Sequence, residues 1–243
     1  MSSESWAFKV DDFIFPSFST LNDFVFRNIA TCNPSQNLFD DIAQPQDYEN
    51  LFELEESSNP IHKKINQKSR PLEYGSFCSL FLKPLTPPWG QGRFGDGHNY
   101  GVIYTALEEK TSIKEVFFYL QKDALRMFPH TSGTFIQYDR SMLKAKIESK
   151  KVYNLCSLAK KYPELVHKES YDFCQKIGVQ ARKKEAEALM SFSVRNEGGI
   201  CVPIFTANCI KKDKKIFYLS FVFYKSGRYE IQKSKEIQSG VFK

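Results

Sequence analysis

The sequence predicts an α+β fold, with a mixed β core, flanking helices and an N-terminal extension. Of its 243 residues, 42% are hydrophobic and 22 are Phe, which indicates a packed globule rather than a disordered chain. After residue 71, short runs rich in aromatic and β-branched residues alternate with segments of helical periodicity. We therefore place the extension at residues 1–66 and the core domain at residues 67–243.

The extension contains an aromatic cluster and an acidic segment. Residues 1–66 are expected to be irregular or helical, and residues 13–26 include a Phe-rich apolar cluster that Pro16 breaks. Residues 47–56 predict a short acidic helix that Pro60 stops.

The first part of the core domain predicts two strands and a helix. The strands are expected at residues 77–82 and 100–106, with a loop rich in Pro and Gly between them. Thr111 is expected to cap a helix that runs through Leu120 and places its apolar side chains on one face.

The middle of the core domain predicts two strands followed by two helices. The strands are expected around residues 135–138 and 151–155, a polar helix around residues 160–164, and a longer helix over residues 169–190.

The C-terminal part predicts a pair of strands and an edge strand. Residues 199–205 and 216–223 are expected to pair, joined by an exposed hairpin tip at the charged residues 211–215. In the tail from Lys225, polar residues alternate with apolar ones, and this segment is expected to form an edge strand.

Charge and cysteine usage narrow the function classes. The net charge of +6 is a mild excess that suits an anionic small molecule or an acidic partner, and alone it does not indicate nucleic-acid binding. None of the six cysteines forms a Cys-x-x-Cys pair and the four histidines lack zinc spacing, so we expect free thiols and no metal site. A signal peptide and a transmembrane run are both lacking, so the expected location is the cytoplasm.

Four residues have chemistry that would suit cleavage of a nucleotide. The glycine-flanked Arg93 offers a planar fork of donors for a phosphate, and Tyr104 could stack on a nicotinamide or a ribose. Glu115 could accept hydrogen bonds from ribose hydroxyls and stabilise an oxocarbenium-like transition state, and Ser193 could bind a phosphate or a ribose hydroxyl. Each residue type more often has a structural role: a surface arginine, a core tyrosine, a helix-face glutamate or a loop serine.

Motifs of other common enzyme and nucleotide-binding classes are not found in the sequence. The sequence has no Gly-x-Ser-x-Gly elbow, no Gly-x-Gly-x-x-Gly fingerprint and no Walker loop. The lysine-rich segments lack interleaved aromatic residues, so they are interpreted as solvated faces.

Taken in order, these motifs resemble the RES domain family, which is named for its arginine, glutamate and serine. The resemblance rests on Arg-Phe-Gly at residues 93–95, Gly-Val-Ile-Tyr at residues 101–104, Glu115, and Ser-Val-Arg at residues 193–195. It extends over residues 47–223. Many members have a proline just before the serine, where this chain has Phe192, and the loop after Arg93 carries Asp96 and His98.

The resemblance implies an ADP-ribosyltransferase-like catalytic domain at residues 67–243 and a toxin of a toxin–antitoxin pair that consumes NAD. By matching motif, the catalytic residues would be Arg93, Tyr104, Glu115 and Ser193, and the NAD-binding residues would be Phe94, Gly95 and Arg195. NAD would be the substrate, cleaved by hydrolysis or by phosphorolysis with phosphate as co-substrate, and no metal would be needed.

Two alternatives remain open. The chain could be a mono-ADP-ribosyltransferase that modifies a protein, as a toxin or as a secreted effector, or a non-catalytic module that binds a nucleotide or an antitoxin. The expected partner is an antitoxin with an Xre-like helix-turn-helix; neither a membrane nor direct nucleic-acid binding is expected, and a homodimer is left open.

Overall fold

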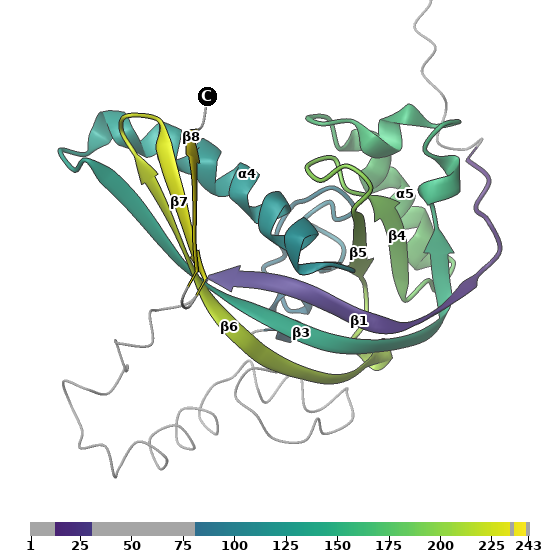
Figure 1. The fold of residues 1–243 in the computed structure, drawn as a ribbon. Helices are drawn as coiled ribbons and strands as arrows, with labels where there is room; N and C mark the ends of the chain where they lie inside the picture. Colours follow the sequence, from purple (N-terminus) through teal and green to yellow (C-terminus); the bar gives the residue numbers. More distant parts are fainter. Residues whose placement is uncertain (1–12, 31–80, 234–235, 242–243) are drawn as a thin grey trace, which may run out of the picture.

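The central feature of the fold is an eight-stranded mixed sheet (Figure 1). The computed structural model describes residues 13–30, 81–233 and 236–241. The sheet order is β1-β2-β5-β4-β3-β6-β7-β8. The strands are β1 (Ser19–Ala30), β2 (Ile103–Ala106), β3 (Phe135–Asn154), β4 (Ala188–Phe192), β5 (Ile200–Ile204), β6 (Ile210–Tyr224), β7 (Arg228–Lys233) and β8 (Glu236–Val241). The helices are α4 (Glu109–Met127) and α5 (Asp172–Lys183). The predicted α+β class, with a mixed β core and flanking helices, is confirmed.

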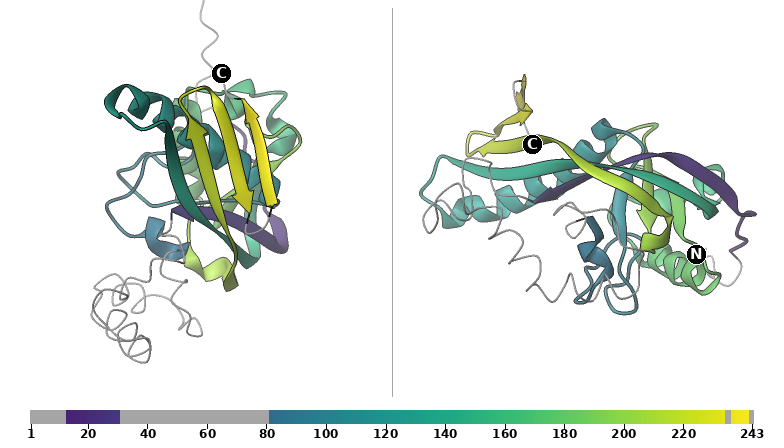
Figure 2. Two further views of the ribbon diagram at one scale, coloured as in Figure 1. Left: turned by 60° about the vertical axis from the view of Figure 1, so that its left-hand side comes forward. Right: turned by 90° about the horizontal axis from the view of Figure 1, so that it is seen from below.

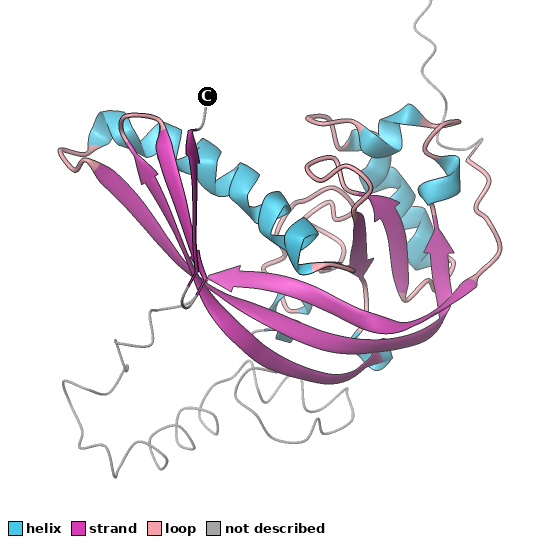
Figure 3. Cartoon of the chain, in the orientation of Figure 1, coloured by secondary structure: helices cyan, strands magenta, loops and turns pink. Residues whose placement is uncertain are grey.

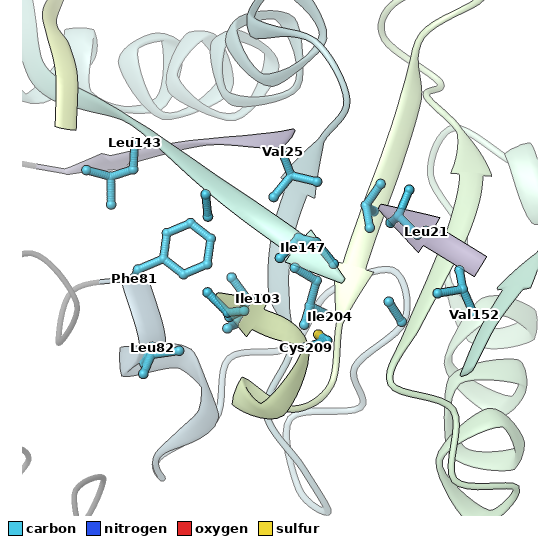
Figure 4. Packing of buried hydrophobic residues seen from close by; sticks show 14 of the residues in the cluster. Leu21, Val25, Phe81, Leu82, Ile103, Leu143, Ile147, Val152, Ile204 and Cys209 are labelled. Atoms are coloured by element: carbon cyan, nitrogen blue, oxygen red, sulfur yellow. The ribbon is translucent and has the colours of Figure 1, made fainter. Parts of the chain in front are cut away.

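Strand β1 closes part of the sheet into a ring. It pairs antiparallel with β3, from Ser19 opposite Val152 to Ala30 opposite Arg140, and its Phe26 also pairs with Ala106 of β2. Since β2 pairs with β5, β5 with β4 and β4 with β3, these five strands return to their starting point. The buried side chains that pack together in Figure 4 come from every strand of this ring.

The expectation of an irregular or helical lead-in was therefore wrong for residues 19–30, which form β1. In β1, Leu21, Val25 and Ile29 are buried at even spacing, which is the periodicity of one face of a strand. The sheet thus takes one strand from the segment that precedes residue 67. The predicted acidic helix at residues 47–56 lies outside the described residues, as do residues 77–80 of the first predicted strand, whereas Phe81 and Leu82 form a helical turn instead of strand.

Helix α4 follows β2 of the ring and packs against the strands outside it, β6 and β7 (Figure 2). It begins after β2, and its Ile113, Phe117 and Leu120 pack against the buried cluster that Phe221 and Phe223 of β6 help to form. The N-cap is Glu108, so the prediction that Thr111 caps this helix was wrong; Thr111 is a buried residue of the first turn. The predicted strand at residues 100–106 is confirmed for Ile103–Ala106.

Three other elements differ from the sequence prediction. The strands expected around residues 135–138 and 151–155 are the two ends of the single strand β3. The polar helix expected around residues 160–164 is replaced by two 3-10 turns, at Cys156–Leu158 and Pro163–Val166. The helix expected over residues 169–190 ends at Lys183, and residues 188–190 belong to β4 (Figure 3). Glu185, with a φ of 60°, takes the left-handed conformation that stops a helix.

The predicted hairpin at residues 199–223 was also wrong. Strand β5 pairs with β2 and β4, whereas β6 pairs with β3 and β7. Residues 211–215, expected as an exposed tip, lie within β6 because the long strand β3 offers a partner along them. The tail forms β7 and β8, and β8 is the edge strand of the sheet, as predicted.

Two further predictions concern thiols and membranes. Cys156, Cys174, Cys201 and Cys209 are free, which agrees with the expected reduced cysteines for this part of the chain. Neither α4 nor α5, the two α-helices of the described residues, is long and apolar enough to cross a bilayer.

The contribution of β1 to the core gives a first prediction. Ile29 is 7% exposed within the ring, whereas Asn22 on the same strand is exposed. Ile29→Ala should lower the free energy of unfolding by about 2–5 kcal/mol, because a buried side chain is lost and a cavity remains. Asn22→Ala should change it by no more than about 0.5 kcal/mol. Urea unfolding followed by circular dichroism measures both, and equal effects would show that β1 is not part of the folding core.

Candidate active site

A cavity of about 410 Å³ lies among β1, β2, β5 and the first turns of α4. Its volume falls in the range of roughly 300–1,000 Å³ that small-molecule sites usually have. The charged residues on its wall are Arg27, Arg93 and Glu115. The uncharged polar and aromatic residues on the wall include Asn28, Phe94, Tyr104, Ser112, Tyr119, Tyr171, Ser191, Phe192 and Cys201.

The cavity brings together most of the residues singled out by sequence. Arg93, Phe94, Tyr104 and Glu115 lie on its wall, and Ser193 contacts Glu115 from behind that wall. Gly95 and Arg195 are not among the lining residues.

Glu115, in the second turn of α4, is held through one carboxylate oxygen. Its Oε1 accepts a hydrogen bond of 2.5 Å from the Ser193 hydroxyl and a longer one of 3.6 Å from the Cys201 thiol. Both donors reach the same oxygen, and within the described residues Oε2 receives no hydrogen bond. The carboxylate is therefore oriented by the protein while one oxygen remains available to a ligand.

The Ser193 hydroxyl is positioned by the loop that follows β4. Its Oγ accepts hydrogen bonds from the backbone N–H groups of Arg195 (3.1 Å) and Asn196 (2.9 Å). Because these two donors occupy the lone pairs of Oγ, its proton is directed to Glu115. The Asn196 amide also donates to Thr111 Oγ1 at 2.8 Å, which ties the loop to the first turn of α4.

Arg93 is held by a loop carbonyl and an aromatic ring. Its Nη1 donates to the carbonyl of Leu165 at 3.3 Å, and its guanidinium carbon lies 4.7 Å from the ring centre of Tyr171. Its Nη2 is buried and has no hydrogen-bond partner within the described residues. A buried donor without an acceptor is costly, and an oxyanion in the cavity would supply the missing acceptor.

Tyr104 of β2 holds the glycine-flanked loop that carries Arg93. Its hydroxyl oxygen accepts a hydrogen bond from the backbone N–H of Phe94 at 3.0 Å. Burial raises the pKa of this hydroxyl above its ordinary value. The loop is closed by a hydrogen bond from Gly92 N–H to the Gly95 carbonyl at 2.9 Å, and Gln175 of α5 donates to the Gly92 carbonyl at 2.9 Å.

The three residues predicted to bind NAD differ in placement. Phe94 is 1% exposed, and its carbonyl accepts a hydrogen bond from the Tyr100 hydroxyl at 2.6 Å, so it anchors the loop while contributing to the wall. Gly95 packs against Val102, which a Cβ would approach to 2.9 Å. Arg195 places its guanidinium carbon 3.3 Å from the ring centre of Phe118 and donates to the Lys168 carbonyl at 2.6 Å, which braces the Ser193 loop.

Several lining residues escaped the sequence analysis. Tyr119 of α4 and Tyr171 before α5 share a hydrogen bond of 2.6 Å between their hydroxyl oxygens. Burial, and then the bond to Tyr171, raise the pKa of the Tyr119 hydroxyl. Phe192, the departure from the family pattern, is 37% exposed and lines the cavity. No short-range signal marks Tyr171, because its loop reaches the cavity only through the packing of α5.

The chemistry available to the cavity comes from the carboxylate of Glu115 and the guanidinium of Arg93, which both lie on its wall. Within the described residues, no group of three or more His, Cys, Asp and Glu could hold a metal ion. A fixed carboxylate stabilises positive charge that develops beside it, and a guanidinium binds phosphate oxygens in pairs.

Comparison with known proteins gives a family and a distant structural likeness. The RES domain matches residues 76–223. A chain in the crystal structure of the M. tuberculosis MbcT-MbcA toxin-antitoxin complex is similar with a TM-score of 0.42 and 9% identity, over 82% of this chain and 86% of that chain. This likeness is too weak to add to the family match. No curated protein matches the chain.

The tight contact between the loop and Tyr104 gives a second prediction. A Cβ at Gly92 would lie 2.5 Å from the Tyr104 hydroxyl oxygen, whereas a Cβ at Gly90 would meet nothing within 4 Å. Gly92→Ala should therefore displace Tyr104 and lower the free energy of unfolding by about 1–3 kcal/mol. Gly90→Ala serves as the matched control and should be close to neutral. If chemical denaturation shows the two variants to be equal, Tyr104 does not pack on this loop.

The contact between Cys201 and Glu115 gives a third prediction. Burial, and then the charge of Glu115, raise the pKa of the Cys201 thiol, so little of it is thiolate at pH 8. Glu115→Gln removes the negative charge, which lowers this pKa and should speed alkylation of Cys201 by iodoacetamide severalfold. Peptide mass mapping measures the rate at each cysteine. The pKa of Cys156 is raised by burial without Glu115, so its rate should not change, and an unchanged rate at Cys201 as well would contradict the contact.

Proposed function

Because the chain belongs to the RES domain family, we propose that it is an NAD-consuming enzyme that cleaves the bond between nicotinamide and ribose. The RES match and the cavity around Glu115 support this proposal together: the first gives the chemistry that the resemblance implies, and the second gives the groups that could perform it.

The observation that carries the proposal is the orientation of Glu115. As neutral nicotinamide departs from NAD, positive charge grows on the ribose ring at the carbon that loses it. A carboxylate that is already fixed by Ser193 and Cys201 needs no reorganisation to stabilise that charge, and its Oε2 is available to the ribose. Ser193 acts in this proposal as a positioning residue, since its hydroxyl is already engaged by two N–H donors and by Glu115.

Arg93 would hold the diphosphate of NAD. Its unpartnered Nη2 gains an acceptor when a phosphate oxygen enters the cavity, which favours anion binding there. Tyr104, 38% exposed on the wall, offers a ring face on which the nicotinamide end of the substrate could pack. Phe94 and Gly95 shape the loop that carries Arg93, and Arg195 braces the loop that carries Ser193.

The nucleophile decides the reaction class. With water, the products are ADP-ribose, nicotinamide and a proton. With hydrogen phosphate, whose oxygen bonds to the ribose carbon as nicotinamide leaves, the products are ADP-ribose-1″-phosphate and nicotinamide. With a protein side chain, the chain would be a mono-ADP-ribosyltransferase. The family resemblance also makes an antitoxin with an Xre-like helix-turn-helix the expected partner.

A fourth prediction tests this function. The purified chain should release nicotinamide from NAD, and Glu115→Gln should lower kcat/KM by about 10²–10³-fold, because the stabilising charge is lost. The control is Glu109→Gln on the same helix, whose carboxylate faces Lys233 at 3.2 Å rather than the cavity, and it should retain activity. Mass-resolved chromatography with and without phosphate identifies the product.

The outcomes separate the candidate reactions. ADP-ribose-1″-phosphate that forms only with added phosphate indicates a phosphorylase, and ADP-ribose indicates a hydrolase. A folded chain that leaves NAD intact under both conditions would refute NAD degradation. Labelled NAD incubated with lysate would then distinguish a protein-modifying transferase from a module without activity.

A further inference from the structure

The wall of the cavity includes a polar pair on β1 that the proposed reaction has not used. Arg27 and Asn28 both line the cavity. They precede residue 76, where the match to the RES domain begins. They are therefore supplied by the strand that closes the ring, outside the part of the chain that carries the family motifs.

The amide of Asn28 is oriented with its donor unused. Arg140 of β3 donates from Nε to Asn28 Oδ1 at 2.7 Å and from Nη2 to the Asn28 carbonyl at 2.9 Å. The bond to Oδ1 determines which end of the side-chain amide is the oxygen. Asn28 is only 7% exposed, and its Nδ2 is buried without a hydrogen-bond partner among the residues that the structure describes. Such a donor costs free energy unless a ligand supplies an acceptor.

Arg27, the preceding residue of β1, and Arg140 bring two positive charges to this part of the structure. Arg27 donates to the Phe81 carbonyl, and its guanidinium carbon lies 5.7 Å from the ring centre of Phe81. Burial, and then repulsion from Arg140, lower the pKa of Arg27 to about 10, and burial lowers that of Arg140 to about 10. Both remain cations at neutral pH, and an anion bound near Arg27 would offset the repulsion between Arg27 and Arg140.

We propose that Arg27 and Asn28 form a second anion subsite of the cavity, which binds a phosphate group. Arg27 and the Asn28 amide donate hydrogen bonds to the phosphate oxygens, and Arg140 acts as a positioning residue because it holds the amide. The assignment of this phosphate rests on the proposed function: it is either inorganic phosphate, the attacking co-substrate, or a phosphate of the NAD diphosphate that Arg93 leaves unbound.

The test is the affinity of Asn28→Asp for two probes. The substituted carboxylate keeps the size and the acceptor for Arg140, but it removes the donor and adds a negative charge. Asn22→Asp, on the exposed part of the same strand, makes the same chemical change away from the cavity. Calorimetric titration of the full chain with inorganic phosphate, and separately with ADP-ribose, should give at least one dissociation constant that is tenfold or more weaker in Asn28→Asp than in Asn22→Asp.

The two probes distinguish the source of the phosphate. Weaker binding of inorganic phosphate alone identifies a co-substrate site, and weaker binding of ADP-ribose identifies a diphosphate site. Equal constants in the two variants, or a native chain that binds neither probe, would overturn the subsite. Neither probe has a scissile nicotinamide bond, so this result does not depend on whether the chain cleaves NAD.

A measurement on the unsubstituted chain covers the case in which Asn28→Asp does not fold. Hydrogen–deuterium exchange should slow over residues 25–29 when the effective probe is added, because the bound phosphate ties Arg27 and Asn28 together. Residues 228–233 of β7 provide the internal control and should not change. Exchange at residues 25–29 that is unaffected by both probes would also overturn the subsite.

Discussion

The pairing of β1 with β3 is the constraint on which the site depends. Because β1 also meets β2, the ring of five strands closes, and strands far apart in the sequence come to face the same space. Arg27 on β1, Tyr104 on β2 and Cys201 on β5 line one cavity for this reason. Helix α4 leaves directly from β2, so the ring also determines where Glu115 points.

Hydrogen bonds to helices and strands hold the two loops that carry Arg93 and Ser193. The loop after β4 is tied to α4 twice, once through Asn196 and Thr111 and once through Ser193 and Glu115. The loop of Arg93 is tied to α5 through Gln175 and to β2 through Tyr104. The loops supply the functional side chains, and their hydrogen bonds to helices and strands fix the positions of those side chains.

The sequence predicted the local elements better than their arrangement. The pattern after residue 100 predicted β2 and most of α4, since both follow from spacing within a few residues. Motif order predicted that Glu115 and Ser193 belong together, and their side chains share a hydrogen bond across 78 positions of the chain. The pairing of β6 with β3, the strand β1 and the lining residues Asn28 and Tyr171 were missed, because long-range packing produces them. Thr111 was read as a cap because its residue type favours one, although burial against Asn196 places it inside the helix.

The division of the cavity wall between two parts of the chain has a consequence for its chemistry. Arg93, Tyr104, Glu115 and Ser193 all fall within residues 76–223, which match the RES domain, whereas Arg27 and Asn28 come from β1. In the proposed reaction, Glu115 would interact with the charge that develops on the ribose, whatever attacks it, so its role would be the same for every nucleophile. The group that selects between water and phosphate can then lie elsewhere on the wall. In our proposal, the polar pair on β1 would affect that choice without changing the hydrogen bonds of Glu115, because Arg27 contacts Phe81 and Asn28 contacts Arg140.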